Sequence, residues 1–268
     1  MMKKLLAWTL ALAMLFVCLS AAVSAAGFTD GDSIGDPYKT AVEQMTALGV
    51  LNGFPDGTFQ PKGTLTREQG AKIIAYMRLG SDVNALTCSE APFAEVEADR
   101  WSAPSIAWCA DRGILLGYGD GTFGPTDPLT GDQFAKMLLC AFSLGDPARY
   151  AGIGWYERVR EDAGAAGLYA GDSTMATDRA ISREQAALLA WNAIKAAEKA
   201  AADKLEAAGH AGNTGTAGTS GTAGGSGYDS ASLAWLNYLL SQLAAGSQTS
   251  GNGSSSHTGE DIELPDLP

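Results

Sequence analysis

The feature that most constrains this chain is a nine-residue turn that occurs twice. Residues 53–61 read GFPDGTFQP and residues 117–125 read GYGDGTFGP, so the two copies share six of nine positions. Both copies precede a Leu-Thr pair and an amphipathic run. An active-site loop is usually made once, whereas a turn repeated at a fixed period is typical of stacked copies of one small unit.

The sequence around the first copy predicts a helix, a turn and a second helix. Apolar residues recur at helical spacing before the turn, and Gly49 is well placed to end that helix. In the turn, Gly53 and Gly57 allow positive φ, and Asp56 can accept hydrogen bonds from nearby backbone N–H groups. The second helix is predicted to start at LTREQ, with a Thr N-cap and a Gln capping-box partner three positions later.

The same order recurs twice more along the chain. The second unit has Gly113 as the helix end and Thr130 as the next N-cap. In the third unit, Gly167 and Ser182 take these places, but the turn is shorter and lacks Asp-Gly-Thr-Phe. One such unit is too small to bury its apolar stripes, whereas three packed units can share a core.

We therefore predict an all-α fold, in which three tandem helix-turn-helix repeats pack as a pseudo-trimeric bundle. The polar, Gly-rich sequence after the third repeat predicts a flexible linker, one short amphipathic helix and a disordered acidic tail. The expected boundaries are repeats at 27–90, 91–148 and 149–208, the linker at 209–227, the helix at 228–246 and the tail at 247–268. An unknown protein partner is a possible role for the helix at 228–246, alongside folding back, self-association or a membrane surface.

The N-terminus, residues 1–26, has the pattern of a secretory signal peptide. The cationic start MMKK is followed by the apolar stretch LLAWTLALAMLFVCL and the small residues SAAVSAAG. An uncleaved anchor or lipidation at Cys18 fits less well, because the apolar run is short and Val17 precedes the cysteine. We expect an exported protein with no integral membrane segment after cleavage.

Composition excludes several classes of function. The net charge of −12 and the pI of about 4.5 argue against nucleic-acid binding through a basic face. Both histidines, His210 and His257, lie in Gly/Ser/Thr-rich sequence, which argues against His-based catalysis and most zinc sites. We predict no catalytic residue, no metal and no cofactor. Beyond residue 26 the cysteines are odd in number and lack a CxxC pattern, and one disulfide among Cys88, Cys109 and Cys140 stays open.

The three units together resemble the S-layer homology (SLH) family. The motifs that carry the resemblance are FTD…YKTAV…GVLNGFPDGTFQPKGTLTREQ, FAEV…WSAPSIAW…GILLGYGDGTFGPTDPLTGDQ and WYERV…GLYAG…ISREQ. The resemblance implies a three-pronged helical bundle that anchors exported proteins by non-covalent binding of secondary cell-wall polysaccharide. The ligands it implies are anionic, often pyruvylated glycans, and the implied location is the cell wall or S-layer.

The family's functional positions transfer unevenly to this chain. The resemblance implies glycan-binding roles for the motif arginine, the first-helix tryptophan, the lead aspartate and the Gly-rich turn. The matching residues are Arg67, Arg183, Trp101, Trp155, Asp30, Tyr38, Gly53 and Gly117. Gly131 replaces the motif arginine in the second unit, and Tyr38 stands beside the first unit's tryptophan position. We therefore expect one or two working grooves and not three.

Guanidinium chemistry supports these assignments. Arginine can donate two parallel N–H bonds to a carboxylate, and an arginine at a helix start lies beside backbone N–H groups that the helix leaves free. Each candidate also has an ordinary explanation: the arginines can be surface residues, the tryptophans core residues, and the aspartates and glycines of the turn mere turn-formers. Two further classes stay open: a structural envelope protein that self-assembles without glycan, and an enzyme using a carboxylate pair such as Glu157 and Glu161.

Overall fold

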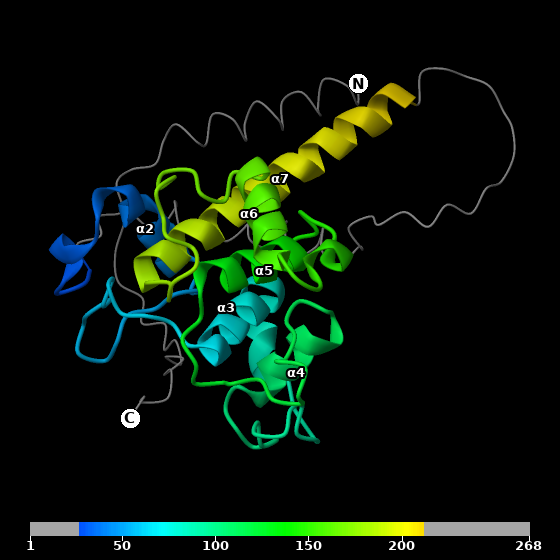
Figure 1. The fold of residues 1–268 in the computed structure, drawn as a ribbon. Helices are drawn as coiled ribbons and strands as arrows, with labels where there is room; N and C mark the ends of the chain where they lie inside the picture. The colour runs from blue at the N-terminus through cyan, green and yellow to red at the C-terminus, as the bar shows by residue number, and fades with distance from the viewer. Residues whose placement is uncertain (1–26, 212–268) are drawn as a thin grey trace, which may run out of the picture.

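The computed structural model describes residues 27–211, with side chains to residue 204. The predicted signal peptide, linker, helix at 228–246 and acidic tail all lie outside this range. Within it, the secondary structure is α-helical, with short 3-10 turns and isolated bridges but no strand (Figure 1). The helices are α2 (Lys39–Ala47), α3 (Arg67–Leu79), α4 (Ala103–Asp111), α5 (Gly131–Ala141), α6 (Trp155–Ala165) and α7 (Arg183–Ala211). The 3-10 turns are η1 (Gly31–Ser33), η2 (Asp36–Tyr38), η3 (Gly80–Ala85) and η4 (Pro147–Tyr150).

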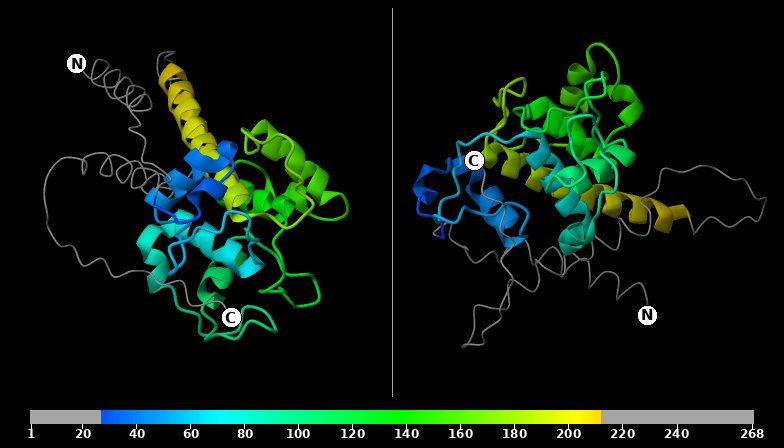
Figure 2. Two further views of the ribbon diagram at one scale, coloured as in Figure 1. Left: turned by 90° about the vertical axis from the view of Figure 1, so that its left-hand side faces the viewer. Right: turned by 90° about the horizontal axis from the view of Figure 1, so that it is seen from below.

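The helices are arranged as three units in a closed ring. Unit one contributes α2 and α3, unit two α4 and α5, and unit three α6 and α7. The first helix of each unit packs on the second helix of the unit before it: α4 on α3, α6 on α5, and α2 on α7. The last pairing joins the two ends of the described chain, and α7 continues past the other helices (Figures 1 and 2). The expected all-α bundle is confirmed.

Three buried aliphatic residues at the centre of the ring join the units through their backbones. The N–H of Leu129 donates to the carbonyl of Leu65 at 2.8 Å, and the N–H of Ile181 donates to that of Leu129 at 2.8 Å. The N–H of Leu65 completes the cycle by donating to Ile181 at 3.2 Å. All three side chains are buried in the core. We call these residues the hub. Each hub residue comes from a different unit, so the hub forms only when all three units are present.

The second helix of each unit starts with the capping box that the sequence predicts. Thr66 accepts from the N–H of Gln69, and the Gln69 side chain accepts from the N–H of Thr66 at 2.9 Å. Thr130 and Ser182 cap α5 and α7 in the same way. This pattern satisfies two donors at each helix start and orients each helix toward the hub.

Glycines close the first helices, as expected. Gly49, Gly113 and Gly167 have φ of 69°, 64° and 76°, in the left-handed region that favours glycine at a helix end. The expectation for Gly53 was wrong, because its φ is not positive. Gly53 is instead required by close packing, since a Cβ there would lie 2.5 Å from Cε1 of Phe28.

The third turn keeps more of the repeat than its letters indicate. Asp172 accepts hydrogen bonds from the N–H and hydroxyl of Thr174, as Asp56 does from Thr58. The separation from this aspartate to the start of the next helix is eleven residues in all three units. The residues missing from unit three therefore lie between Gly167 and Asp172, and the turn itself is intact.

Two other observations bear on the sequence predictions. Across residues 27–211, no helix is both long and apolar enough to cross a bilayer. Cys88, Cys109 and Cys140 are all free.

We predict that Leu129→Ala lowers the free energy of unfolding by about 2–5 kcal/mol, because it opens a cavity where the three units meet. Urea denaturation followed by circular dichroism measures this change. Leu116→Ala is the matched control: Leu116 is 58 % exposed, and we expect its loss to change stability by under about 0.5 kcal/mol. Equal effects of the two substitutions would contradict a hub-centred core.

Candidate functional site

Arg67 lies at the boundary between units one and two, which we call the first boundary. It is the first residue of α3 and only 7 % exposed. Its Nε donates to the carbonyl of Phe123 at 2.7 Å, and its Nη2 donates to that of Leu116 at 3.1 Å. The guanidinium lies 4.7 Å from the ring centre of Tyr118 and 4.4 Å from that of Phe123. Unit one thus supplies the cation, and the turn of unit two encloses it.

Arg183 repeats this arrangement at the boundary between units three and one, the third boundary. It is 5 % exposed and starts α7. Its Nε donates to the carbonyl of Phe59 at 2.8 Å, and its Nη2 to that of Asn52 at 2.7 Å. The rings of Phe54 and Phe59 are each 4.8 Å away. Burial lowers the pKa of Arg183 to about 10, so the side chain stays protonated at neutral pH.

Both guanidinium groups keep one nitrogen for another partner. Among the described residues, neither arginine forms an ion pair with a carboxylate, and neither Nη1 makes a hydrogen bond. The buried side-chain N and O atoms without a partner in residues 27–204 are Tyr169 Oη and Asn192 Oδ1. The two Nη1 groups are absent from that set, so they retain contact with solvent. Each site is therefore a largely desolvated cation with one accessible edge.

The second boundary, between units two and three, lacks this cation. Gly131 starts α5 in the place of the motif arginine, and a Cβ on it would lie 2.9 Å from Cα of Thr177. Backbone contact therefore seals the space that an arginine side chain fills at the other two boundaries.

The helix starts do not offer free N–H groups, so this part of the sequence-based mechanism is wrong. At the first boundary the N–H groups of Arg67 and Glu68 donate to the carbonyls of Asp127 and Pro125, each at 3.0 Å. Equivalent bonds to the neighbouring turn occur at the starts of α5 and α7. The neighbouring unit occupies the donors that a helix normally leaves for a ligand, and the arginine side chains remain the donors facing outward.

The acidic residue after each motif position ties its unit to the next one. Arg100 donates to both carboxylate oxygens of Glu68 at 2.7 and 2.9 Å, and Ser102 adds a third bond at 2.6 Å. Arg160 likewise donates to both carboxylate oxygens of Asp132, at 2.9 and 2.6 Å. The Asp and Glu side chains are buried, and these paired charges hold the first two boundaries closed.

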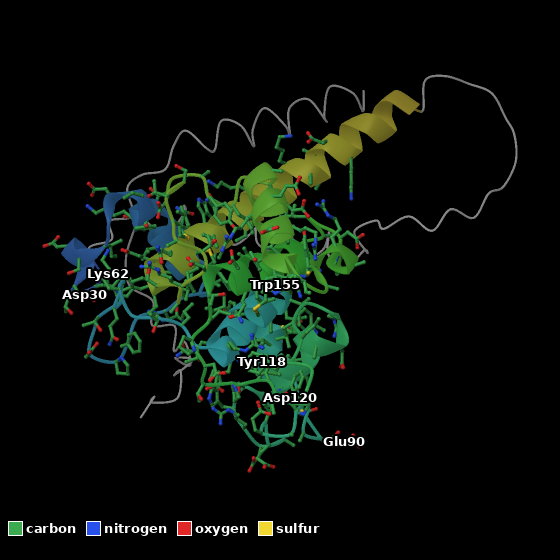
Figure 3. All side chains as sticks on the ribbon, in the orientation of Figure 1. Asp30, Lys62, Glu90, Tyr118, Asp120 and Trp155 are labelled. Atoms are coloured by element: carbon green, nitrogen blue, oxygen red, sulfur yellow. The ribbon has the colours of Figure 1, made fainter. Side chains whose placement is uncertain are left out.

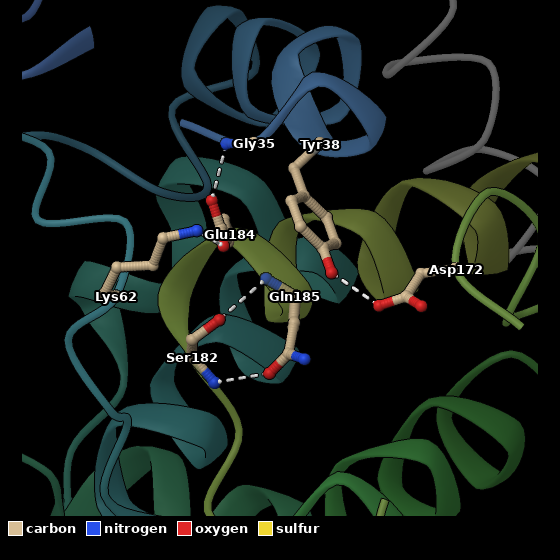
Figure 4. Close-up of polar contacts among 7 residues, drawn as sticks. All are labelled: Gly35, Tyr38, Lys62, Asp172, Ser182, Glu184 and Gln185. Atoms are coloured by element: carbon tan, nitrogen blue, oxygen red, sulfur yellow. Dashed lines mark hydrogen bonds and ion pairs between the residues drawn. The ribbon is translucent and has the colours of Figure 1, made fainter. Parts of the chain in front are cut away.

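The third boundary uses different groups for the same purpose (Figure 4). Glu184 accepts from Lys62 and from the N–H of Gly35 at 3.0 Å. Tyr38 donates to Asp172 across the same boundary at 2.5 Å. Burial, together with the adjacent Asp172 carboxylate, raises the pKa of Tyr38 to about 12. Tyr38, a predicted ligand contact, is thus engaged in joining unit one to unit three.

Asp30 lies beside the Arg183 site and fixes the shape of its turn. Its two carboxylate oxygens accept from the N–H groups of Phe59 and Gln60 at 2.7 and 2.8 Å. Glu95 takes this place in unit two with a single oxygen, Oε1, which accepts from the N–H groups of Phe123 and Gly124, each at 2.5 Å. These bonds hold in place the turn whose Phe59 carbonyl receives Arg183. Gly117, like Gly53, is needed for close packing, because a Cβ would lie 2.4 Å from the carbonyl of Thr122.

The two predicted tryptophans are half-buried. Trp155 starts α6 and packs against the core, with Nζ of Lys136 5.4 Å from its ring centre. Trp101 precedes α4 and follows Arg100, which brings it to the first boundary. Figure 3 shows that Trp155 and Tyr118 lie on different elements.

Sequence reasoning missed the aromatic rings that enclose the guanidinium groups. Tyr118 and Phe54 occupy equivalent positions in the two Gly-rich turns, directly after Gly117 and Gly53. Tyr118 is 51 % exposed, and its hydroxyl donates to Asp127 at 2.7 Å. The sequence signal was an aromatic residue at the second position of both turn copies. Its role beside a guanidinium can be recognised only once the position of the arginine is known.

Comparison with known proteins identifies two segments of this chain. Residues 27–71 and 97–135 match the family model described as S-layer homology domain. These segments supply the two sides of the first boundary. No match to this model covers unit three, so the third SLH motif remains a prediction.

Similar proteins include cell-surface and wall proteins. The chain is 36 % identical over 89 residues to cell surface glycoprotein 1 of Acetivibrio thermocellus, covering 33 % of this chain and 4 % of that protein. It is 35 % identical over 88 residues to the cellulosome-anchoring protein of the same organism, covering 32 % and 20 %. It is 33 % identical over 97 residues to an uncharacterized cell wall amidase of Bacillus anthracis, covering 36 % and 18 %. The chain thus spans a fifth or less of each relative.

We predict that Tyr38→Phe removes one tyrosine that ionises near pH 12. The folded chain holds Tyr38 neutral, so its stabilising contribution is complete below about pH 10, the ordinary tyrosine pKa, and is lost as the pH rises through 12. Absorbance at 295 nm against pH, taken as wild type minus variant, isolates this residue. A difference curve centred near pH 10 would mean that Tyr38 is neither buried nor bonded to Asp172.

Proposed function

We propose that this chain is a non-catalytic, exported cell-surface protein held on the cell wall by non-covalent binding of an anionic secondary wall polysaccharide. The single observation that carries the proposal is the pair of buried arginines, Arg67 and Arg183, each with Nη1 accessible at a boundary between units. The matched S-layer homology segments and the names of the relatives support the surface location.

Carboxylate-bearing sugars fit the accessible edge of each arginine. Nε and Nη2 are committed to backbone carbonyls, and two aromatic rings cover the guanidinium. The hydrogens on Nη1, with the remaining one on Nη2, still allow two N–H bonds to one carboxylate, as a ketal-linked pyruvate offers. A desolvated cation that is not ion-paired gains more from an anion than a surface arginine does. The Trp101, Trp155, Asp30 and Gly-rich turn contacts of the family remain part of this proposal.

We infer two anion sites and not three, because the second boundary lacks the motif arginine. Because Gly131 contacts the Thr177 backbone, the second boundary has no arginine at the motif position, and its Arg160 is already paired with Asp132. We infer that the second boundary has no arginine-based anion site like those at the other two boundaries.

An enzyme is the weaker candidate, although one relative is named as a cell wall amidase. The alignment with that relative covers 18 % of its length. In this chain, Glu161, one of the carboxylate pair considered above, is an exposed partner of Arg149 at 3.1 Å. A solvated ion pair on a helix surface is poorly suited to act as an acid in glycan hydrolysis.

Wall binding provides the direct test. We expect the purified chain to sediment with wall sacculi that retain their polysaccharide and to stay in solution when the polysaccharide has been removed. Arg67→Lys and Arg183→Lys keep the charge but lose the planar fork, and we expect each to weaken binding roughly tenfold and the double variant to abolish it.

Arg112→Ala is the matched control, because it removes an exposed cation at the C-terminal end of α4 that packs over Trp108 and contacts neither arginine site. Its binding should equal that of the wild type. Thermal melts of all variants separate lost binding from lost folding. Equal sedimentation with and without polysaccharide, or wild-type binding by a folded double variant, would refute the proposal.

A further inference from the structure

Tyr118 is the exposed aromatic residue of the Arg67 site. Half of this residue's surface is accessible, although the guanidinium of Arg67 lies against its ring. A large aromatic ring left open beside a buried cation costs apolar exposure to water. An aromatic side chain on this turn can be buried, because Phe123 is only 1 % exposed. The exposure of Tyr118 is therefore not a necessary result of how the turn packs.

The ring of Tyr118 is fixed in place before any ligand arrives. Its hydroxyl donates to Asp127, and the backbone of Gly124 lies so close that a Cβ there would be 2.7 Å from Cε2 of the ring. Arg67 lies against the ring, and about half of the Tyr118 residue nevertheless stays accessible. A rigid, flat, partly apolar surface binds with little loss of side-chain entropy.

We infer that Tyr118 is a specificity-determining residue of the first boundary: the exposed part of its ring packs against the apolar face of a sugar ring whose carboxylate sits on the accessible edge of Arg67. This inference rests on the proposed function. Sugars offer a face of C–H groups, and aromatic rings are suited to such faces because they combine an apolar body with a polar tip. Leu116, which is also exposed, extends the apolar surface on the same turn.

The same argument makes the two arginine sites unequal. Phe54 holds the equivalent place at Arg183, but it is only half-exposed at most and has no hydroxyl to fix it. The site at Arg67 therefore selects for a sugar ring next to the acid, whereas the site at Arg183 depends more on the acid alone.

The second boundary provides a matched control for Tyr118. Tyr156 is also an exposed tyrosine, at 40 %, and its ring lies 5.3 Å from the guanidinium of Arg160. Arg160 is already bound to both oxygens of Asp132. Tyr156 thus reproduces the exposed ring beside a guanidinium, but this guanidinium is already ion-paired with a carboxylate.

The test measures binding of the full mature chain to sacculi that retain polysaccharide, for Tyr118→Ala, Tyr118→Phe and Tyr156→Ala. We expect Tyr118→Ala to weaken binding roughly three- to tenfold, in line with an aromatic contact, Tyr118→Phe to stay within about twofold, and Tyr156→Ala to match the wild type. Tyr118→Leu covers Arg67 without offering a flat face; it should behave like Tyr118→Ala and replaces it if the alanine variant does not fold.

The outcomes separate this inference from the proposed function. If binding of the wild type to sacculi does not depend on the polysaccharide, the proposed function is wrong. If the wild type binds but the folded Tyr118→Ala or Tyr118→Leu variant binds equally well, the stacking role alone is refuted. Loss of binding in Tyr118→Phe equal to that in Tyr118→Ala would also overturn it, because the hydroxyl and not the ring face would then be the important group.

Discussion

The cyclic hydrogen bonds of the hub are the constraint on which the rest of the structure depends. A hydrogen bond between two buried backbone groups must be made, because leaving a buried donor or acceptor unpaired costs about 1–3 kcal/mol. Leu65, Leu129 and Ile181 satisfy one another only in a closed cycle of three. The helix that follows each hub residue begins beside the turn of the neighbouring unit. There the first N–H groups of the helix donate to carbonyls of that turn. The ring therefore needs three units not only to close in space but also to pair these buried backbone groups.

This closure explains where the arginines lie. An arginine at the first position of a helix that leaves the hub must enter the turn of the next unit, because that turn already accepts the helix-start N–H groups. The turn supplies two carbonyls and two aromatic rings around the guanidinium. Burying an arginine in this way without a carboxylate is costly, and lowers the pKa of Arg183. A structure that needed only a filler at this position could use an apolar residue; at the second boundary it uses glycine.

The sequence predicted the parts of the fold that local chemistry determines. The capping boxes, the glycines that end helices and the repeat order follow from residues three to five positions apart, so Thr66, Gln69 and Gly49 could be interpreted directly. The pairing of units could not, because Arg67 contacts Phe123 across 56 positions and Arg183 contacts Phe59 across 124. The prediction of free N–H groups at the helix starts was wrong for the same reason. A helix start looks unsatisfied in sequence, and only the tertiary arrangement shows that the turn of another unit satisfies it.

The acidic character of the chain sets a further condition on the proposed binding mode. A protein of net charge −12 repels an anionic polymer at long range, so attraction must come from short-range contacts at Arg67 and Arg183. Salt near physiological strength screens charges beyond about 8 Å but affects buried contacts much less. Screening thus removes the repulsion while preserving the attraction, the opposite of what surface-charge binding would give. Two sites on one rigid ring also allow one polymer to engage both, which raises avidity without any new contact. An acidic surface and an acidic ligand are therefore compatible when the cations are enclosed between units.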